Sequence, residues 1–404
     1  MSRQVDLAII GGGMVGASLA VALAPLPLRV ALIEAVAHDA ADQPSFDERT
    51  TALSNASRRV FETVGVWNGI ASQATAIARI HISDRGRFGF ARIEASEQGL
   101  PALGYVMPNR VLGRALWASI AAQANLQVHC PARVSVAERS EQAVTLRVTD
   151  ASGTESMLQA RLVVAADGAH SSVRQAFGIE SDVSDYAQTA LITTVLAQQF
   201  HGFTAYERFT NEGPLALLPM SDGRCTAVLT LSSERARDAL QWDDAQYLAE
   251  LQSRFGFRLG RFLQAGRRSA YPLALTQSAA LTAPRCIIMG NAAQSLHPVA
   301  GMGFNLGLRD AACLAELLAA GPADAGDANL LSEYAAWRAQ DRRGIIGFTD
   351  SLVRLFSNPM AGVGMLRNAG LLAFDLLPPA KSALSRLASG TARASRLARG
   401  VPLT

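Results

Sequence analysis

Residues 5–16 read Val5-Asp6-Leu7-Ala8-Ile9-Ile10-Gly11-Gly12-Gly13-Met14-Val15-Gly16, and a second apolar run at 28–33 is closed by Glu34. Strand, glycine turn, helix and strand in this order form the dinucleotide-binding fingerprint in its expected context. Gly11 permits the tight turn, Gly13 leaves room for a pyrophosphate, and Gly16 lets the helix approach the strand. The stretch therefore predicts a Rossmann-like α/β domain.

The helix after the glycine turn is expected to run from Met14 to Ala24, where Pro25 ends it. Its first residues, Met14 and Val15, place free N–H groups and the positive end of the helix dipole beside the phosphates. Glu34 follows about 20 residues on, where a carboxylate accepts hydrogen bonds from an adenosine ribose. These features predict a bound dinucleotide. The alternative is a glycine-rich turn in an α/β fold without a ligand.

Length and composition exclude several classes of protein. The 404 residues predict two interlocked domains, and a content of 49% hydrophobic and 18% charged residues predicts a globular chain. A net charge of +3 is too small to indicate nucleic-acid binding. The four cysteines form no Cys-x-x-Cys pair, which argues against a metal site and favours a reducing compartment. With no secretory signal or spanning segment expected, the prediction is a cytoplasmic protein.

The pattern along the chain predicts a discontinuous first domain. Residues 1–180 and 276–350 are expected to form it, with small strand insertions near 77–107. Residues 181–275 are rich in Thr, Val, Phe and Leu between turn residues, which predicts an inserted antiparallel sheet that binds the substrate. Residues 351–404 predict a helical C-terminal region with a basic tail.

Three further segments have the features of ligand-binding turns. Residues 161–174 form a strand, an Asp167-Gly168 turn and a helix start; residues 290–298 follow another strand. Residues 301–310 open a helix through Gly301-Met302-Gly303, whose glycines let backbone N–H groups approach a ring as far as Asn305.

These segments resemble the FAD-dependent aromatic hydroxylases of the para-hydroxybenzoate hydroxylase type. Residues 83–86, 207–210, 213–225 and 268–275 resemble, within that family, the ubiquinone-biosynthesis hydroxylases, and most nearly the 2-polyprenyl-6-methoxyphenol hydroxylases. The resemblance covers about residues 3–375. It implies bound FAD, with NAD(P)H and O2 as co-substrates. A flavin C4a-hydroperoxide would then hydroxylate a polyprenyl 6-methoxyphenol to the 1,4-benzoquinol.

The resemblance also assigns cofactor contacts. It places Arg49 at the FAD pyrophosphate, Arg110 near the adenosine, Asp167 in FAD and NAD(P)H handling, and Pro298 at the flavin face. Each has a structural alternative, such as a solvated loop arginine or an ordinary Asp-Gly turn. The turn at 301–303 is expected to stabilise the negative charge of reduced flavin. A second complete glycine fingerprint is absent, so NAD(P)H is expected to bind transiently in a groove.

Two polar positions beside the flavin motifs are ambiguous. Most of the wider family has Gly-Asp where this chain has Gly290-Asn291, so Asn291 would accept the ribityl hydrogen bond without charge assistance and hold flavin less tightly. Asp310 is either the structural partner of Arg309 or another arginine, or a cofactor residue.

The acid–base group is open, because hydroxylation needs a partly deprotonated phenol and three side chains qualify. Tyr206, Tyr271 and His297 are the candidates, although a packed histidine before Pro298 and a core tyrosine are equally ordinary structural features. No metal site is expected.

An apolar wall is expected for a polyprenyl substrate, and the same side chains would also fill a plain core. Its candidates are Leu215, Leu217, Pro219, Val228 and Leu275. The tail after Leu376 is basic and contains no acid, which fits either contact with the inner face of an anionic membrane or a solvated terminus. Its basic residues are Lys381, Arg386, Arg393, Arg396 and Arg399.

Other functions remain open at this level. They are a sister hydroxylase acting at another ring carbon, an FAD-dependent reductase of a polyprenyl lipid, and a flavin-holding scaffold subunit. Assembly with other ubiquinone-biosynthesis proteins is expected beside catalysis.

Overall fold

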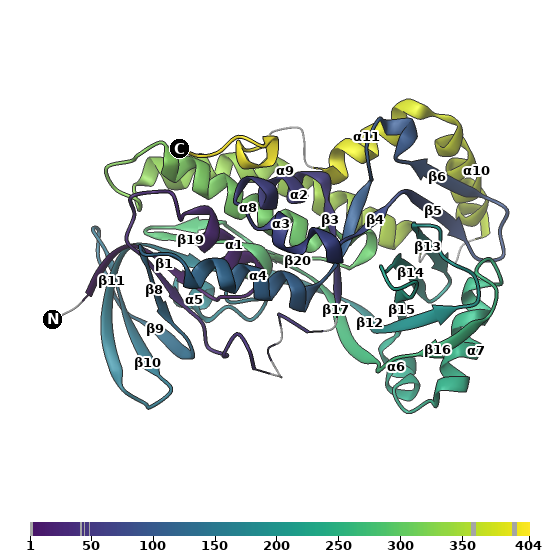
Figure 1. Cartoon of the computed structure of the whole chain (residues 1–404), viewed down its shortest axis with the longest axis horizontal. Helices are drawn as coiled ribbons and strands as arrows, with labels where there is room; N and C mark the ends of the chain where they lie inside the picture. Colours follow the sequence, from purple (N-terminus) through teal and green to yellow (C-terminus); the bar gives the residue numbers. More distant parts are fainter. Residues whose placement is uncertain (1–2, 41–42, 44, 48, 357–360, 390–393) are drawn as a thin grey trace.

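The computed structural model describes residues 3–40, 43, 45–47, 49–356, 361–389 and 394–404. Figure 1 shows two lobes side by side, with the long helix α9 (Ala328–Phe356) passing from one toward the other. The first lobe is built on an eight-stranded sheet and the second on a nine-stranded sheet. The fold class predicted from the sequence is confirmed: an α/β first domain, an inserted sheet domain and a helical C-terminal region.

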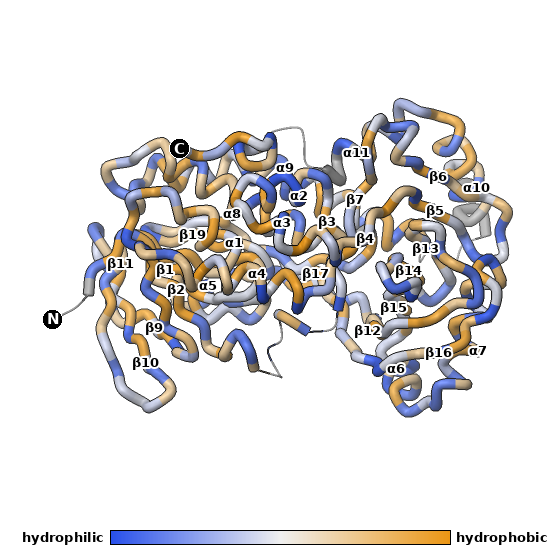
Figure 2. The backbone as a smooth tube through the Cα atoms, in the orientation of Figure 1, coloured by the Kyte–Doolittle hydropathy of each residue, from blue (hydrophilic) through white to orange (hydrophobic). Residues whose placement is uncertain are grey.

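The first lobe has a parallel sheet at its centre. Its strands are β18 (Thr282–Ala283), β19 (Cys286–Ile288), β11 (Glu155–Ala165), β1 (Arg3–Ile10), β2 (Val30–Ile33) and β8 (Leu126–His129) in spatial order. β10 (Val144–Asp150) pairs with β11, and β9 (Ala132–Arg139) pairs with β10. β1 pairs in parallel with both β11 and β2, and hydrophobic colours run through β1 and β2 in Figure 2. Continuous apolar strands form here because helices bury both faces.

The second sheet is mostly antiparallel. Its order is β20 (Gln294–Ser295), β17 (Ser269–Ser278), β12 (Ser181–Ala197), β15 (Cys225–Ser232), β14 (Gly213–Pro219), β13 (Thr204–Thr210), β5 (Arg79–Asp84) and β6 (Phe90–Glu94), with β16 (Phe262–Ala265) on β12. β5 pairs in parallel with β13. The expected limits 181–275 thus leave out β5 and β6, which the chain contributes from much earlier.

A three-stranded sheet lies between the lobes. It consists of β3 (Thr50–Ser54), β7 (Gly104–Pro108) and β4 (Thr75–Ile77). Ile77 and Val106 from this sheet pack with Ala205 and Leu218 from the second lobe. The strands expected near 77–107 therefore divide between two sheets.

The other helices cover the sheets and the lobe junction. They are α1 (Met14–Ala22), α2 (Asn55–Thr63), α3 (Trp67–Ile70), α4 (Asn109–Ala121), α5 (Ser172–Ala176), α6 (Ser233–Ala239), α7 (Asp244–Phe255), α8 (Met302–Ala319), α10 (Ala361–Leu376) and α11 (Pro378–Ser389). Short 3-10 turns are η1 (Ala71–Gln73), η2 (Ser96–Gln98), η3 (Gly290–Ala292), η4 (Val299–Gly301) and η5 (Leu397–Arg399). Residues of α1, α4 and α8 share the core of the first lobe.

The chain after α11 returns to the first lobe. Leu397 is buried, its carbonyl accepts a hydrogen bond from Thr63, and the Arg396 N–H donates to Glu316. Lys381 is also buried and forms ion pairs with Glu97 and Asp375. The basic residues expected to form one membrane-facing tail are therefore dispersed: Arg386 and Arg399 are exposed, and Arg393 lies outside the described residues.

Candidate active site

The glycine turn between β1 and α1 has the geometry that the fingerprint requires. Gly11 has a φ of +101°, and a Cβ there would collide with the Ala166 carbonyl oxygen. A Cβ on Gly16 would collide with the Gly11 carbonyl oxygen. A Cβ on Gly13 would lie 2.7 Å from Ser45 Oγ, and Gly13 begins α1 without a side-chain cap. The first N–H groups of α1 therefore remain available to an anion.

Glu34 is held toward this turn by two backbone amides. Its carboxylate accepts hydrogen bonds from the Gly12 N–H at 2.5 Å and from the Val36 N–H at 2.8 Å. The Trp117 indole N–H donates to the Gly12 carbonyl oxygen at 3.2 Å. Because a carboxylate has about four acceptor sites, Glu34 retains capacity for ribose hydroxyls.

Asp167 presents an unused acceptor at the end of β11. Its Oδ2 accepts from the Val173 N–H at 3.3 Å and the Ser172 hydroxyl at 3.4 Å. Its Oδ1 is buried and accepts no hydrogen bond from the described part of the chain. A buried acceptor without a donor costs about 1–3 kcal/mol, so a ligand donor is expected at this atom. Together with the glycine cradle, Asp167 fits a site for FAD.

The first turn of α8 offers a second cradle. Gly301 begins the helix at a φ of +60° without a side-chain cap, and a Cβ on Gly303 would meet no atom within 4 Å. The exposed space and the free N–H groups match the site expected for the negative charge of reduced flavin.

Asn305 has a different role from the one expected of its side chain. Its Oδ1 accepts from the Ser54 N–H at 2.8 Å and the Ser57 hydroxyl at 2.6 Å. Its Nδ2 donates to the Ala52 and Gly301 carbonyl oxygens, both at 2.8 Å. The side chain is thus committed to holding the α8 turn against β3 and α2, and the N–H groups left for a cofactor are those of the residues before Asn305.

Asp310 is an arginine partner, although not of Arg309. Its Oδ1 accepts from Arg338 Nε at 2.7 Å, whereas Arg309 pairs with Asp341 at 2.9 Å. Its Oδ2 accepts from the Gly290 N–H at 3.3 Å and from Gln294 Nε2 at 3.1 Å. Asp310 therefore fixes the turn that carries the exposed Asn291. Gln294 belongs to the same network.

Arg49 lies where the two lobes meet. Its guanidinium stands over the Tyr271 ring at 4.4 Å and forms an ion pair with Asp47 at 2.6 Å. The Tyr271 hydroxyl donates to Asp47 Oδ2 at 3.0 Å, and burial raises the Tyr271 pKa. Tyr271 is therefore a protonated donor at the junction rather than a core aromatic. The sequence singled out Arg49 and Tyr271 but missed Asp47, which joins them.

The other two acid–base candidates are packed side chains. Tyr206 contacts Phe255 edge-on at 5.2 Å in the second lobe, and burial raises its pKa. His297 Nδ1 accepts from the Val299 N–H at 3.2 Å, and its ring contacts Tyr186 edge-on at 5.4 Å. Burial lowers the His297 pKa to about 4, so the ring is neutral at pH 7.

The apolar wall predicted from the sequence corresponds only in part to the junction. Leu215 and Leu217 are fully buried against Tyr247 and Leu251 of α7, on the face away from the junction. Side chains alternate along a strand, so their neighbours Ala216 and Leu218 face the other way. Val228 pairs with Ala216 and lies on that second face.

Thr226 lies two residues before Val228 on β15 and therefore on the same face. Its hydroxyl forms a 3.0 Å hydrogen bond with that of Thr50, at the junction. On β17, Leu275 lies an even number of residues from Tyr271 and therefore on the same face of the sheet. Pro219 is buried and, for the same reason, lies on the face of Leu217. The corrected wall therefore comprises Ile192, Ala216, Leu218, Val228 and Leu275.

The remaining predicted cofactor residues surround the two turns. Val15 packs beneath Gly290 and Gly307, whose Cβ positions would lie 3.1 and 2.8 Å from its side chain. Met302 is buried, Met14 and Pro298 are half-buried, and Arg110 is exposed at the second residue of α4.

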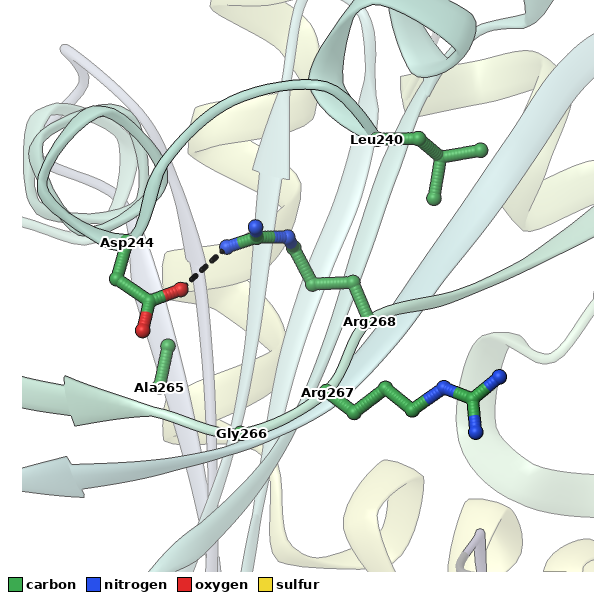
Figure 3. Close-up of a pocket in the computed structure, with 6 residues that line it drawn as sticks. All are labelled: Leu240, Asp244, Ala265, Gly266, Arg267 and Arg268. Atoms are coloured by element: carbon green, nitrogen blue, oxygen red, sulfur yellow. Dashed lines mark hydrogen bonds and ion pairs between the residues drawn. The ribbon is translucent and has the colours of Figure 1, made fainter.

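A separate cavity of about 380 Å³ lies in the second lobe. Figure 3 shows Arg268 directed toward Asp244, at 2.9 Å, and Arg267 directed away from it. The cavity is lined by Leu240, Asp244, Ala265, Gly266, Arg267 and Arg268. None of these residues belongs to the turns or the wall described above.

Comparison with known proteins matches this arrangement. A family model described as "FAD binding domain" matches residues 4–349, and the chain therefore belongs to the FAD-binding monooxygenase family. Its curated relatives include the ubiquinone hydroxylase UbiL of Rhodospirillum rubrum, 36% identical across 99% of this chain and 94% of that protein. Another is the 3-demethoxyubiquinol 3-hydroxylase of Escherichia coli, 32% identical across 93% of this chain and 95% of that protein. Within the family, the chain groups with the ubiquinone-biosynthesis hydroxylases.

Solved structures show the same fold. The p-nitrophenol 4-monooxygenase PnpA of Pseudomonas putida superposes with a TM-score of 0.78 at 19% identity, covering 95% of this chain and 97% of that one. PqsL of Pseudomonas aeruginosa gives a TM-score of 0.76 at 22% identity, covering 92% and 100%. Within the described ranges, no helix has the length and apolar character needed to cross a membrane.

Proposed function

We propose that this chain hydroxylates the ring of a polyprenyl 6-methoxyphenol to the 1,4-benzoquinol in ubiquinone biosynthesis, with NAD(P)H and O2 as co-substrates. The observation that carries the proposal is the junction itself, where a cradle suited to FAD adjoins an apolar strand face. The Thr50–Thr226 and Asp47–Tyr271 hydrogen bonds hold the two together. The names of the curated relatives support the choice of a ubiquinone precursor.

The chain's own residues would bind and orient the cofactor. The 11–16 turn and the α1 N-terminus would hold the pyrophosphate, Glu34 the ribose, and Asp167 Oδ1 a donor from the cofactor. The N–H groups at the start of α8 would stabilise negative charge on the reduced ring. When bound, FAD supplies the redox and oxygen-activating chemistry, which no side chain of the protein provides.

The substrate ring would lie between the cradle and the wall. Tyr271 keeps its proton because burial raises its pKa, and because that proton is donated to Asp47, its hydroxyl oxygen is left to accept a hydrogen bond from the substrate phenol. Asp47 orients that hydroxyl and balances the charge of Arg49. The side chains of Ala216, Leu218 and Val228 would contact the prenyl chain and exclude water.

A sister reaction at another ring carbon is the second candidate. It is favoured by the name of the Escherichia coli relative, which specifies hydroxylation at position 3 of demethoxyubiquinol. Both candidates use the same cofactor cradle and differ in how the ring is turned within the pocket.

The same proposal extends to location and partners. We place the protein in the cytoplasm at the inner face of the membrane, where its lipid substrate resides, and in assembly with other enzymes of the pathway. Retention on affinity-tagged pathway proteins in cell extracts tests the second part.

The deciding experiment is mass spectrometry of quinone-pathway lipids in cells that lack this gene and lack redundant hydroxylases. Accumulation of a polyprenyl methoxyphenol, cleared when the gene is restored, supports the proposal. Another unhydroxylated intermediate moves the reaction to a different carbon. An unchanged profile removes the ubiquinone assignment.

Assays of the purified chain separate the other classes. Incorporation of isotopic oxygen from O2 into the product excludes a reductase, and turnover by the isolated chain excludes a scaffold subunit. Tyr271→Phe is expected to shift the pH profile of turnover while FAD content stays at the parent level.

A further inference from the structure

Helix α10 has its polar side chains turned inward. Both Arg367 and Asn368 are buried, and the Arg367 guanidinium donates to Asp84 Oδ2 at 2.7 and 2.9 Å. The Asn368 amide oxygen accepts from the Gly89 N–H at 2.8 Å. Asp375 accepts from the Arg92 N–H at 2.8 Å. The polar and charged side chains of α10 therefore contact the β5–β6 hairpin rather than solvent.

The outward side of α10 is apolar. Met365 is 72% exposed and Leu376 is 78% exposed, and Ala369 and Ala373 are exposed between them. The spacing of these positions by three or four residues places them on one stripe, with the half-buried Leu372 beside it. An ordinary surface helix has the opposite polarity. We call Met365, Ala369, Leu372, Ala373 and Leu376 the α10 face.

The hairpin that joins β5 to β6 adds basic and aromatic groups. Phe88 is 76% exposed at its tip, and Arg85 and Arg87 are exposed beside it. Gly89 contacts Asn368 so closely that a Cβ would lie 2.6 Å from its amide oxygen. The tip therefore adjoins α10, which Figure 1 shows along the outer side of β6.

We propose that the α10 face and the 85–88 tip form a docking surface for an anionic lipid bilayer. An in-plane helix with an apolar stripe, a neighbouring phenylalanine and flanking arginines is the chemistry that binds a membrane interface. The charge of this surface favours an anionic bilayer as the ligand. Asp84 and Asp375, beside the tip and the stripe, form ion pairs with Arg367 and Lys381, which leaves the exposed Arg85 and Arg87 to make the surface positive. The inference deepens the proposed function and rests on it for the identity of the lipid substrate.

The inner side of α10 connects this surface to the active site. Leu371 and Phe374 pack in one apolar cluster with Phe209, Phe356 and Val299. Val299 directly follows Pro298, the residue expected at the flavin face. The surface proposed for the bilayer and the segment beside the flavin motifs are therefore joined by one packed apolar cluster.

The test uses the full-length chain loaded with FAD in co-sedimentation with vesicles. Vesicles of phosphatidylcholine with phosphatidylglycerol are compared with phosphatidylcholine alone. Met365→Glu combined with Leu376→Glu is expected to lower the partition constant at least about tenfold, because it replaces the two most exposed large apolar side chains of the α10 face with charged ones. Arg85→Glu combined with Arg87→Glu is expected to remove the preference for anionic vesicles.

The matched control is Phe257→Glu, an equally exposed apolar side chain, at 69%, that follows α7 on the second lobe. Its partition should equal that of the parent, and all variants should keep the parent unfolding midpoint. Equal vesicle binding by the Met365→Glu, Leu376→Glu variant overturns the proposal. So does a parent that ignores vesicles and instead forms dimers that these substitutions dissociate.

Two substrates keep this test separate from that of the function. The α10 variant should turn over a short-chain, water-soluble phenol at the parent rate, and a vesicle-embedded polyprenyl phenol several-fold more slowly. Absence of turnover of either substrate by the parent contradicts the proposed function. It leaves the vesicle measurement to decide the docking surface by itself.

Discussion

The two lobes bury their sheets in different ways. In the first lobe, helices cover both faces of the parallel strands, so that Leu7, Leu32 and Val163 are all fully buried. In the second lobe, α6 and α7 cover one face of the sheet, and the other face meets the junction. In the first lobe, the residues available to a ligand therefore lie in the turns at strand ends. In the second lobe, residues that face the junction alternate along each strand with residues that pack in the core.

The strongest test of this difference concerns the buried network that supports the first-lobe turns. Asp310→Ala is expected to lower the free energy of unfolding by about 3–5 kcal/mol, because it leaves Arg338 buried without its closest carboxylate. FAD affinity should fall with it, since the Gly290 turn loses its acceptor. Urea unfolding and fluorescence titration of FAD measure the two effects.

The control for Asp310 is an exposed ion pair. Asp222→Ala breaks an ion pair with Arg224 in which both side chains are more than 40% exposed, and a loss below about 1 kcal/mol is expected. Equal losses for the two substitutions would contradict the structural role of Asp310.

A second test compares neighbouring strands of the second lobe. Leu217→Ala is expected to cost about 2–5 kcal/mol of stability, because it opens a cavity against α7. Val228→Ala, on the junction face, should raise the KM for a polyprenyl phenol with a smaller loss of stability. Thermal unfolding and steady-state kinetics distinguish them, and the reverse pattern would show that the faces are assigned backwards.

A third test uses two buried histidines. Burial lowers the pKa of His297, between β20 and η4, and of His81, on β5, to about 4 from 6.5. The unfolded chain thus binds more protons between pH 6.5 and 4, so stability is complete above pH 6.5 and falls as the pH decreases through this window. Each histidine contributes up to about 3 kcal/mol.

Substitution by an uncharged residue measures that contribution. His297→Asn should reduce the slope of unfolding free energy against pH between 6.5 and 4, leaving the share of His81. An unchanged slope would mean that His297 is protonated in the folded protein. The Val299 N–H, which donates to Nδ1, retains an acceptor in the asparagine oxygen.

The smallest expected effect is at Asn291. Asn291→Asp should tighten FAD binding by up to about tenfold, because a carboxylate makes a charge-assisted hydrogen bond where the amide makes a neutral one. Titration of the apoprotein with FAD measures it. Unchanged affinity would mean that residue 291 does not contact the cofactor.

The sequence predicted the first lobe well because its signals are local. Gly11 and Gly16 have to be glycines because a Cβ at either position would collide with a nearby backbone carbonyl oxygen. The strands on either side of the turn are continuous apolar runs, which are also visible in the sequence. A partner such as Asp47 could not be predicted, since its contact with Tyr271 depends on how two lobes meet. For the same reason, alternation in β14 showed that two faces exist but not which one faces α7.

The number of basic residues at the end of the chain likewise did not predict where their side chains lie. The tail after Leu376 contains no acid of its own, yet Lys381 finds Glu97 on η2 and Asp375 on α10. The apolar stripe on α10 is present in the sequence at 365, 369 and 376. It became informative only when the structure showed that Arg367, Asn368 and Asp375 point inward.

The position of β19 in the first sheet has a consequence for synthesis. β11 pairs with β1 on one edge and, over Glu155–Ala160, with β10 on the other, but Val163–Ala165 on that second edge stay unpaired until Cys286–Ile288 has been made. The inserted lobe emerges from the ribosome in the meantime, so the nascent chain carries this short unpaired segment throughout that interval. The Gly290 turn and the α8 cradle emerge later still. A chain cut short in translation would therefore leave the end of β11 unpaired and bind flavin poorly, which gives cellular quality control a means of recognising it.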